Sequence, residues 1–171
     1  KHECADTWMP IDEKGGASYF RKYDGRADLG NTQPGDWALY HGRGYVQLTG
    51  RKNYAKMGGL LGVDLIGNPD LAKVPLTAYQ TACVGMAKGL FTGKGLMDYL
   101  GAQTDWVNAR RIINGTDKAK VIAGYAETLF RSLSAAIRPV DVQPTPPTGD
   151  ALVIAVRDAV SRLQAALDAT T

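Results

Sequence analysis

The hydrophobic and polar positions divide the chain into an irregular first third and a helical remainder. Residues 1–50 hold closely spaced turn signals, such as Pro-Gly-Asp at 34–36 and Gly-Arg-Gly at 42–44. Turns this frequent leave no room for long helices. One short run, residues 45–49, has the composition of a β-strand. The pattern therefore predicts an irregular, glycine-rich lobe with little β-structure.

From residue 51 onward, apolar residues recur at the three- and four-residue steps of amphipathic helices. We expect a helix from residue 51, whose apolar positions are Tyr54, Met57, Leu60 and Leu61, a second over residues 76–91, and a third from a cap at Asp105 to residue 113. The clearest helical pattern follows Thr116 or Asp117, either of which can cap it. Its apolar stripe consists of Val121, Ile122, Tyr125, Leu129, Leu133 and Ala136. The fold class predicted from these patterns is mainly α.

A proline-rich segment separates this helical part from one more amphipathic pattern. Residues 139–149 contain four prolines and predict a semi-rigid linker. Over residues 150–171, capped by Asp150, a last helix carries apolar residues at the 3-4-3-4 spacing of a coiled-coil seam. An isolated helix needs about 12–15 residues to be even marginally stable in water, and this short seam therefore needs a surface to pack against. We expect it to dock on its own domain, on a second copy of the chain or on a partner. The seam consists of Val153, Val156, Val160, Leu163 and Leu167.

Composition and charge narrow the class of protein. Apolar residues make up 44% and charged residues 22% of the 171 positions, which excludes intrinsic disorder for the bulk of the chain. No run of 18 apolar residues occurs, so no membrane-spanning helix is expected. Residues 1–138 carry 18 basic and 13 acidic side chains. Such a mildly basic body favours an anionic surface such as a cell wall and does not require nucleic acid.

Several separated motifs carry a family resemblance. The stretch HGRGYVQLTGRKNY at 41–54 is the most specific of them. The others are His2-Glu3, WMPIDE at 8–13, YDGR at 23–26, DLGNT at 28–32 and IING at 112–115. In this order they resemble glycoside hydrolase family 19, the class I chitinases. The residues within the motifs are most similar to those of the phage and prophage endolysin branch. The resemblance implies a lysozyme-like catalytic domain over residues 1–138. We expect the helix that precedes the His-Glu pair in the family to lie outside this chain.

The resemblance also implies an inverting acid/base mechanism. Such an enzyme needs a general acid and a carboxylate base, with the two carboxyl groups about 6.5–9.5 Å apart to admit a water. The matched positions imply Glu3 as the acid and Asp24 as the base, although the chitinases have glutamate at the latter position. Glu13 is the reserve candidate for the base. Thr49 matches a hydroxyl that holds the attacking water.

Other matched positions imply contacts with the substrate or support of the site. They are Gln47, Asn53, Asn114, Arg43 and Tyr45. Arg43, between two glycines, fits a buried guanidinium that pairs with a catalytic carboxylate. Each candidate also has a purely structural interpretation, such as a turn cap for Asp24 or a helix C-terminal position for Asn114.

Three functional hypotheses remain open at this stage. The first is an endolysin that cleaves the β-1,4 bonds of bacterial peptidoglycan, made in the host cytoplasm and acting on glycan strands of the cell wall. The second is a chitinase acting on N-acetylglucosamine polymers. The third is a non-catalytic wall-binding module. Two histidines and two distant cysteines do not supply a zinc site, so neither a metal nor a cofactor is expected.

Overall fold

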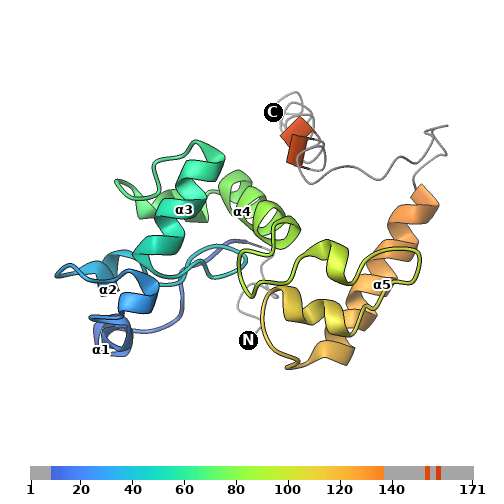
Figure 1. Ribbon diagram of the computed structural model, residues 1–171, viewed down its shortest axis with the longest axis horizontal. Coiled ribbons are helices and arrows are strands. Elements are labelled where there is room, and N and C mark those ends of the chain that lie inside the picture. Colours follow the sequence, from blue (N-terminus) through green and yellow to red (C-terminus); the bar gives the residue numbers. More distant parts are fainter. Residues whose placement is uncertain (1–8, 137–152, 155–156, 159–171) are drawn as a thin grey trace. The chain divides into compact units, whose positions relative to one another are not determined.

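The computed structural model describes residues 9–136 together with Val153, Ile154, Arg157 and Asp158 (Figure 1). Within these residues the chain forms α-helices, short 3₁₀ helices and two isolated β-bridges, with no sheet. The predicted mainly α class is confirmed. No helix in the described part is both long and apolar enough to cross a membrane. The predicted linker at 139–149 and most of the predicted helix at 150–171 lie outside the described residues.

The chain divides into two compact units, residues 1–82 and residues 83–171. The first unit holds mostly short elements separated by turns. They are α1 (Ala17–Phe20), η1 (Arg21–Tyr23), η2 (Ala27–Leu29), α2 (Asp36–Leu39), α3 (Arg51–Leu61), η3 (Pro69–Lys73) and the first part of α4 (Pro75–Ala87). Its buried apolar side chains include Tyr40, Leu48, Tyr54, Met57 and Leu65.

The helix expected from residue 51 is confirmed as α3. Tyr54 and Met57, which the periodicity places on one face, are buried. Gly58 lies on the same side, where an added Cβ would stand 2.7 Å from the backbone oxygen of Val63. The helix ends at Gly62, whose φ of 69° is the left-handed conformation that favours glycine.

Residues 45–49, whose composition is that of a β-strand, instead form part of a turn. Arg43 and Leu48 form an isolated bridge with backbone hydrogen bonds of 3.2 and 2.9 Å. Between them, Gly44 has φ 80° and Gln47 has φ 55°. A positive φ at both ends of the turn reverses the chain within a segment whose composition favours extended structure. An added Cβ at Gly44 would also stand 2.7 Å from the backbone oxygen of Ala72.

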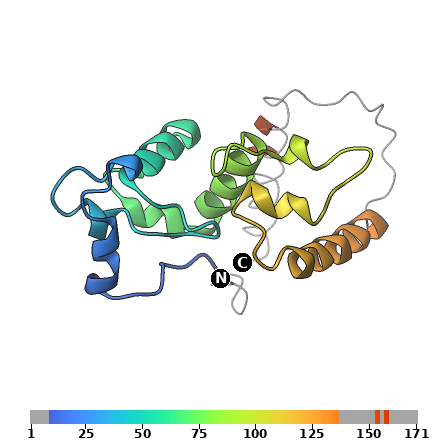
Figure 2. The same ribbon diagram turned by 60° about the horizontal axis from the view of Figure 1, so that its bottom comes forward.

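The second unit holds the end of α4, then η4 (Leu96–Asp98), η5 (Asn108–Ile112) and α5 (Ala119–Ala136). η5 lies beside the first part of α5 in both views (Figures 1 and 2). Helix α4 stops at Ala87, earlier than the pattern predicted, and Gly89 follows with φ 65°. The carboxylate of Asp105 accepts from the Asn108 backbone N–H at 3.0 Å, but the helical segment that follows is a short 3₁₀ helix.

Helix α5 confirms the clearest helical pattern of the sequence, although it begins two residues after Asp117. Its buried side chains are Ala119 and Ala123. Ile122 of the predicted stripe is half-buried, but Val121, Tyr125, Leu129 and Leu133 are more than half exposed, at 51% for Val121 and 64% for Tyr125. The amphipathic pattern therefore predicted the helix but not which face packs against the unit.

Candidate active site

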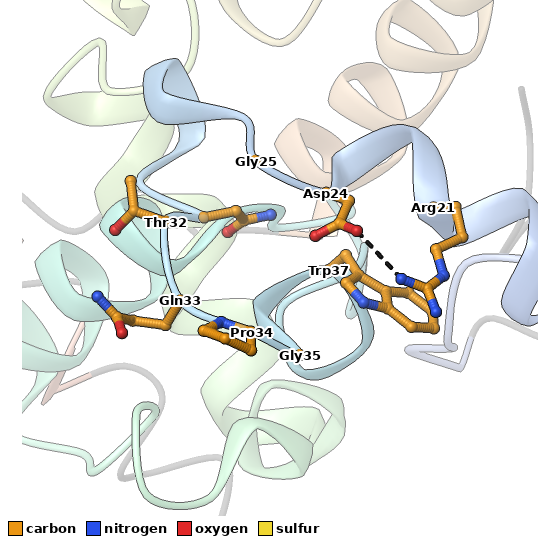
Figure 3. A pocket seen from close by; sticks show the side chains of 9 residues that line it. Arg21, Asp24, Gly25, Thr32, Gln33, Pro34, Gly35 and Trp37 are labelled. Atoms are coloured by element: carbon orange, nitrogen blue, oxygen red, sulfur yellow. Dashed lines mark hydrogen bonds and ion pairs between the residues drawn. The ribbon is translucent and has the colours of Figure 1, made fainter.

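A pocket of about 350 Å³ opens in the first unit, beside the end of η1. It is lined by Arg21, Asp24, Gly25, Asn31, Thr32, Gln33, Pro34, Gly35 and Trp37. Figure 3 shows Arg21, Asp24 and Trp37 on one side and Thr32, Gln33 and Pro34 on the other. Hydroxyl, amide and carboxylate groups beside an indole ring are the chemistry that recognises the hydroxyls and apolar faces of a sugar.

Asp24 is the predicted catalytic residue that lies in this pocket. It directly follows η1, where its backbone N–H donates to the Arg21 oxygen at 3.0 Å. One oxygen of its carboxylate, Oδ2, accepts from the Arg21 guanidinium at 3.1 Å, and 46% of the side chain remains exposed. The same guanidinium lies 4.3 Å from the ring centroid of Trp37. Asp24 is thus oriented by one cation and remains open to the pocket.

Two buried polar residues hold the loop that forms the other wall. Asn31 and Asp36 are each only 1% exposed. Asn31 donates to the backbone oxygen of Tyr23 at 3.1 Å and accepts from the Arg51 N–H at 2.9 Å. Asp36 accepts from the Arg51 guanidinium at 2.8 Å and from the Gln33 N–H at 2.9 Å. These bonds form a frame of buried polar contacts that connects Tyr23, the pocket loop at 31–36 and Arg51 at the start of α3.

The carboxylate of Glu13 is enclosed by hydrogen-bond donors. Oε1 accepts from Lys22 at 2.9 Å and from the Tyr23 hydroxyl at 2.8 Å. Oε2 accepts from the same hydroxyl at 3.0 Å and from the Gly42 N–H at 3.1 Å. Burial raises the pKa of Glu13, but the bonds from Lys22, Tyr23 and Gly42 outweigh it and hold the pKa below its usual value. Both oxygens are thus occupied by the protein's own donors.

Lys22 is held by more than this ion pair. Its ammonium lies 3.4 Å from the ring centroid of Tyr19 and 4.7 Å from that of Tyr23. Burial lowers the pKa of Lys22, but the bonds to Tyr19, Glu13 and Tyr23 outweigh it and raise that pKa above its usual range. Because these contacts converge on one ammonium, they connect Glu13 to η1, the 3₁₀ helix that directly precedes Asp24.

Arg43 is buried, as the two neighbouring glycines suggested, and its partners are structural. Its guanidinium donates to Asp70 at 3.0 Å, to the Leu39 oxygen at 2.7 Å and to the Tyr54 hydroxyl at 3.1 Å. It also lies 3.2 Å from the Asp12 carboxylate. The carboxylates paired with Arg43 are therefore those of Asp12 and Asp70. A contact between Arg43 and substrate stays a prediction.

The remaining candidates from the 41–54 motif follow the turn into α3. The Gln47 amide donates to the Ile11 and Gly44 oxygens, and its buried Oε1 has no hydrogen-bond partner. The Thr49 hydroxyl donates to the Gln47 oxygen at 2.8 Å, and exposed Asn53 donates to the Thr49 oxygen at 2.7 Å. Tyr45 lies exposed on the turn itself. The structure thus places Tyr45 and Gln47 in the turn, Thr49 just after it and Asn53 in the first turn of α3.

Among the candidate residues that the structure describes, only Asp24 lines this pocket. Two further candidates have no described place in the first unit. Glu3, the predicted acid, lies outside the described residues. Asn114 belongs to the second unit, where it is exposed and its side-chain oxygen accepts from the Gly115 N–H at 2.9 Å. Within the described residues, His, Cys, Asp and Glu side chains form no group of three able to hold a metal ion.

Sequence reasoning named neither Trp37 nor the frame of Asn31 and Asp36 as site residues. Asn and Asp beside glycine or proline are usually turn formers, so their burial gave no distinct signal. The available clue was position: Asn31 belongs to the DLGNT motif at 28–32, and Asp36 lies between that motif and the stretch at 41–54.

Comparison with known proteins identifies the sequence around this pocket. Residues 13–87 match the family model of class I chitinases, glycoside hydrolase family 19. Chitinase 8 of Oryza sativa subsp. japonica is 50% identical over 44 residues, which are 25% of this chain and 17% of that protein. Chitinase 11 of the same plant is 34% identical over 109 residues, 50% of this chain and 43% of that protein. Acidic endochitinase Q of Nicotiana tabacum is 48% identical over 44 residues, 25% and 17% of the two chains.

This chain spans less than half the length of these curated relatives. All three are plant chitinases, and the expected link to the phage endolysin branch stays a prediction. The matched residues include Asp24, Glu13 and the whole 41–54 motif but neither Glu3 nor Asn114. The first unit, from Glu13 onward, therefore carries the class I chitinase pattern of glycoside hydrolase family 19.

Proposed function

We propose that this chain hydrolyses the β-1,4 bonds of a chitin-type N-acetylglucosamine polymer, with Asp24 as the catalytic base. The observation that carries the proposal is the position of Asp24: it lines a sugar-sized polar pocket with its carboxylate open to solvent. The class I chitinase match and the plant chitinase relatives support the same reaction and substrate class.

The contrast with Glu13 supports the choice of base. A base that activates water needs a free lone pair within hydrogen-bond reach of that water. Both Glu13 oxygens already accept two hydrogen bonds each. Only one oxygen of Asp24 is paired, with Arg21. Asp24 therefore suits the chemistry, and Glu13 suits a structural role.

The proposed reaction is an inverting displacement. Asp24 takes a proton from a water, whose oxygen forms the new bond to the anomeric carbon while the glycosidic C–O bond breaks. An acid, assigned to Glu3 from the family resemblance alone, gives its proton to the leaving oxygen. Trp37 and the polar groups of the 31–35 loop hold the sugar beside Asp24.

The test is a digest of chitohexaose by the full chain, its products reduced and measured by mass spectrometry. We expect shortened N-acetylglucosamine oligomers. Asp24→Asn should lower kcat by about 10²-fold or more, which is the usual contribution of a general base to the rate. Asp24→Glu, which introduces the glutamate found in the chitinases, should retain activity. Asp28→Asn is the matched control, because that exposed carboxylate pairs with Arg26 and does not line the pocket. Cleavage unchanged by Asp24→Asn refutes the assignment of the base.

Peptidoglycan is the second candidate substrate, and the excess of basic side chains over residues 1–138 favours it. It is tested in parallel with purified wall. A reduced N-acetylmuramic acid end would assign muramidase activity, and its rate should fall as salt rises to ~0.5 M, where screening is strong. Wall binding without cleavage of either polymer would instead support a binding module.

A further inference from the structure

Helix α5 carries a second apolar face that the described residues of its unit leave exposed. Val121, Tyr125, Leu129 and Leu133 recur every four residues and are 51%, 64%, 54% and 60% exposed. At about 100° per residue, these side chains fall within one sector of roughly 120°. The opposite side of the helix carries charge at Lys120, Glu127 and Arg131. Such separation is typical of a helix that packs along its apolar stripe.

The packing already present in the unit uses a different sector of α5. Ala119 and Ala123 are the buried residues of the helix, and η5 is its neighbour. Trp106 contacts the ring of Phe130, with the centroids 5.4 Å apart. At about 100° per residue the exposed stripe lies beside this inner face and not on it, so a second helix can cover the stripe without displacing η5.

The chain itself supplies a helix with a stripe of matching length. The seam from Val153 to Leu167 spans about 21 Å at 1.5 Å per residue, and the stripe from Val121 to Leu133 spans about 18 Å. Val153, Ile154, Arg157 and Asp158 are helical in the structure. The seam residues at 3-4-3-4 spacing are the type that packs against another helix.

The connection between the two helices has sufficient reach. Thirteen residues, 137–149, separate the end of α5 from Asp150. An extended proline-rich segment of this length spans roughly 40 Å at about 3.1 Å per residue, and α5 with 18 residues is about 27 Å long. A tether of this kind gives an effective concentration in the millimolar range. The tethered segment therefore outcompetes a second copy of the chain at micromolar concentrations.

We propose that residues 150–168 fold back as a helix and cover the exposed stripe of α5 in the same chain. The seam side chains then replace solvent over Tyr125 and Leu129, and the charged sides of both helices face water.

Photo-cross-linking in the full chain tests this directly. Tyr125→p-benzoylphenylalanine places the probe in the stripe, on a side chain exposed enough to tolerate it. Ser134→p-benzoylphenylalanine, half a turn around the same helix, is the matched control. At ~1 μM protein, we expect a cross-link at monomer mass that peptide mapping assigns to residues 150–171 for the first probe and none for the second.

A second pair of substitutions keeps the test specific. Leu163→Asp in the seam should abolish the Tyr125 cross-link, whereas Arg162→Asp, on the charged side of the predicted helix, should leave it intact. A cross-linked dimer, a cross-link to another segment or no cross-link at Tyr125 each overturns the proposal.

Discussion

The first unit buries polar side chains, whereas helix α5 exposes large apolar ones. In the first unit, polar Asn31, Asp36 and Arg43 are buried and fully engaged in hydrogen bonds. In α5, large apolar side chains such as Tyr125 and Leu133 are exposed. The comparison teaches that irregular backbone needs buried polar side chains to satisfy its own N–H and C=O groups. A regular helix satisfies these groups internally, and its apolar stripe depends on whatever packs against it.

The largest expected effect is the loss of a buried acceptor from the first unit. Asp36→Ala leaves the Gln33 N–H and the Arg51 guanidinium without their shared partner. Leaving buried or charged donors unpaired costs about 1–3 kcal/mol each, so we expect the free energy of unfolding to fall by about 3 kcal/mol. Urea unfolding measures it. A change below ~1 kcal/mol would mean that water replaces the carboxylate at little cost.

Glu13→Gln should have the next largest effect, about 2 kcal/mol at neutral pH, because the single amide oxygen of glutamine is left for three donors, Lys22, the Tyr23 hydroxyl and the Gly42 N–H. Burial raises the pKa of Glu13, but its hydrogen bonds lower it further, to below the ordinary 4.5. Its stabilising contribution is therefore complete above the ordinary pKa and is lost as pH falls through the lower folded-state pKa. Unfolding curves from pH 7 to 2.5 should converge for parent and variant at the acid end. A constant difference across this range would contradict the ionic role.

Gly58→Ala tests close packing in the first unit with a smaller expected effect. The added Cβ would stand 2.7 Å from the backbone oxygen of Val63, so the helix or the following loop must shift. We expect a loss of about 1–2 kcal/mol, since overpacking outweighs the gain in helix propensity. Gly59→Ala is the matched control, because nothing lies within 4 Å of its added Cβ.

The smallest expected effect is a gain in α5. Gly124 is exposed and an added Cβ there meets nothing within 4 Å. Gly124→Ala should raise the free energy of unfolding by roughly 0.5–1 kcal/mol through helix propensity alone, measured by thermal unfolding. If Gly124→Ala destabilises the protein instead, another segment must pack closely at that position.

The same contrast explains what could be predicted from the sequence. Periodicity predicted α3 and α5 because a helix of 11 or 18 residues repeats its signal over several turns. It failed at residues 45–49, where the positive φ of Gln47 depends on tertiary contacts. The family motifs pointed to Asp24 and Glu13, but only coordinates distinguish an open carboxylate from an enclosed one. Glu3 stays a prediction because it lies outside the described residues.

The cluster around Lys22 has a consequence for chemical labelling. Exposed lysines usually react readily with acylating reagents, and the Lys22 side chain is 40% exposed. Only the neutral amine is nucleophilic, however, and burial is outweighed by bonds to Tyr19, Glu13 and Tyr23 that raise the Lys22 pKa. Lys22 is thus an accessible lysine that should react more slowly than its exposure suggests, so coupling of this protein to a resin or dye through its amines should favour its other lysines over Lys22.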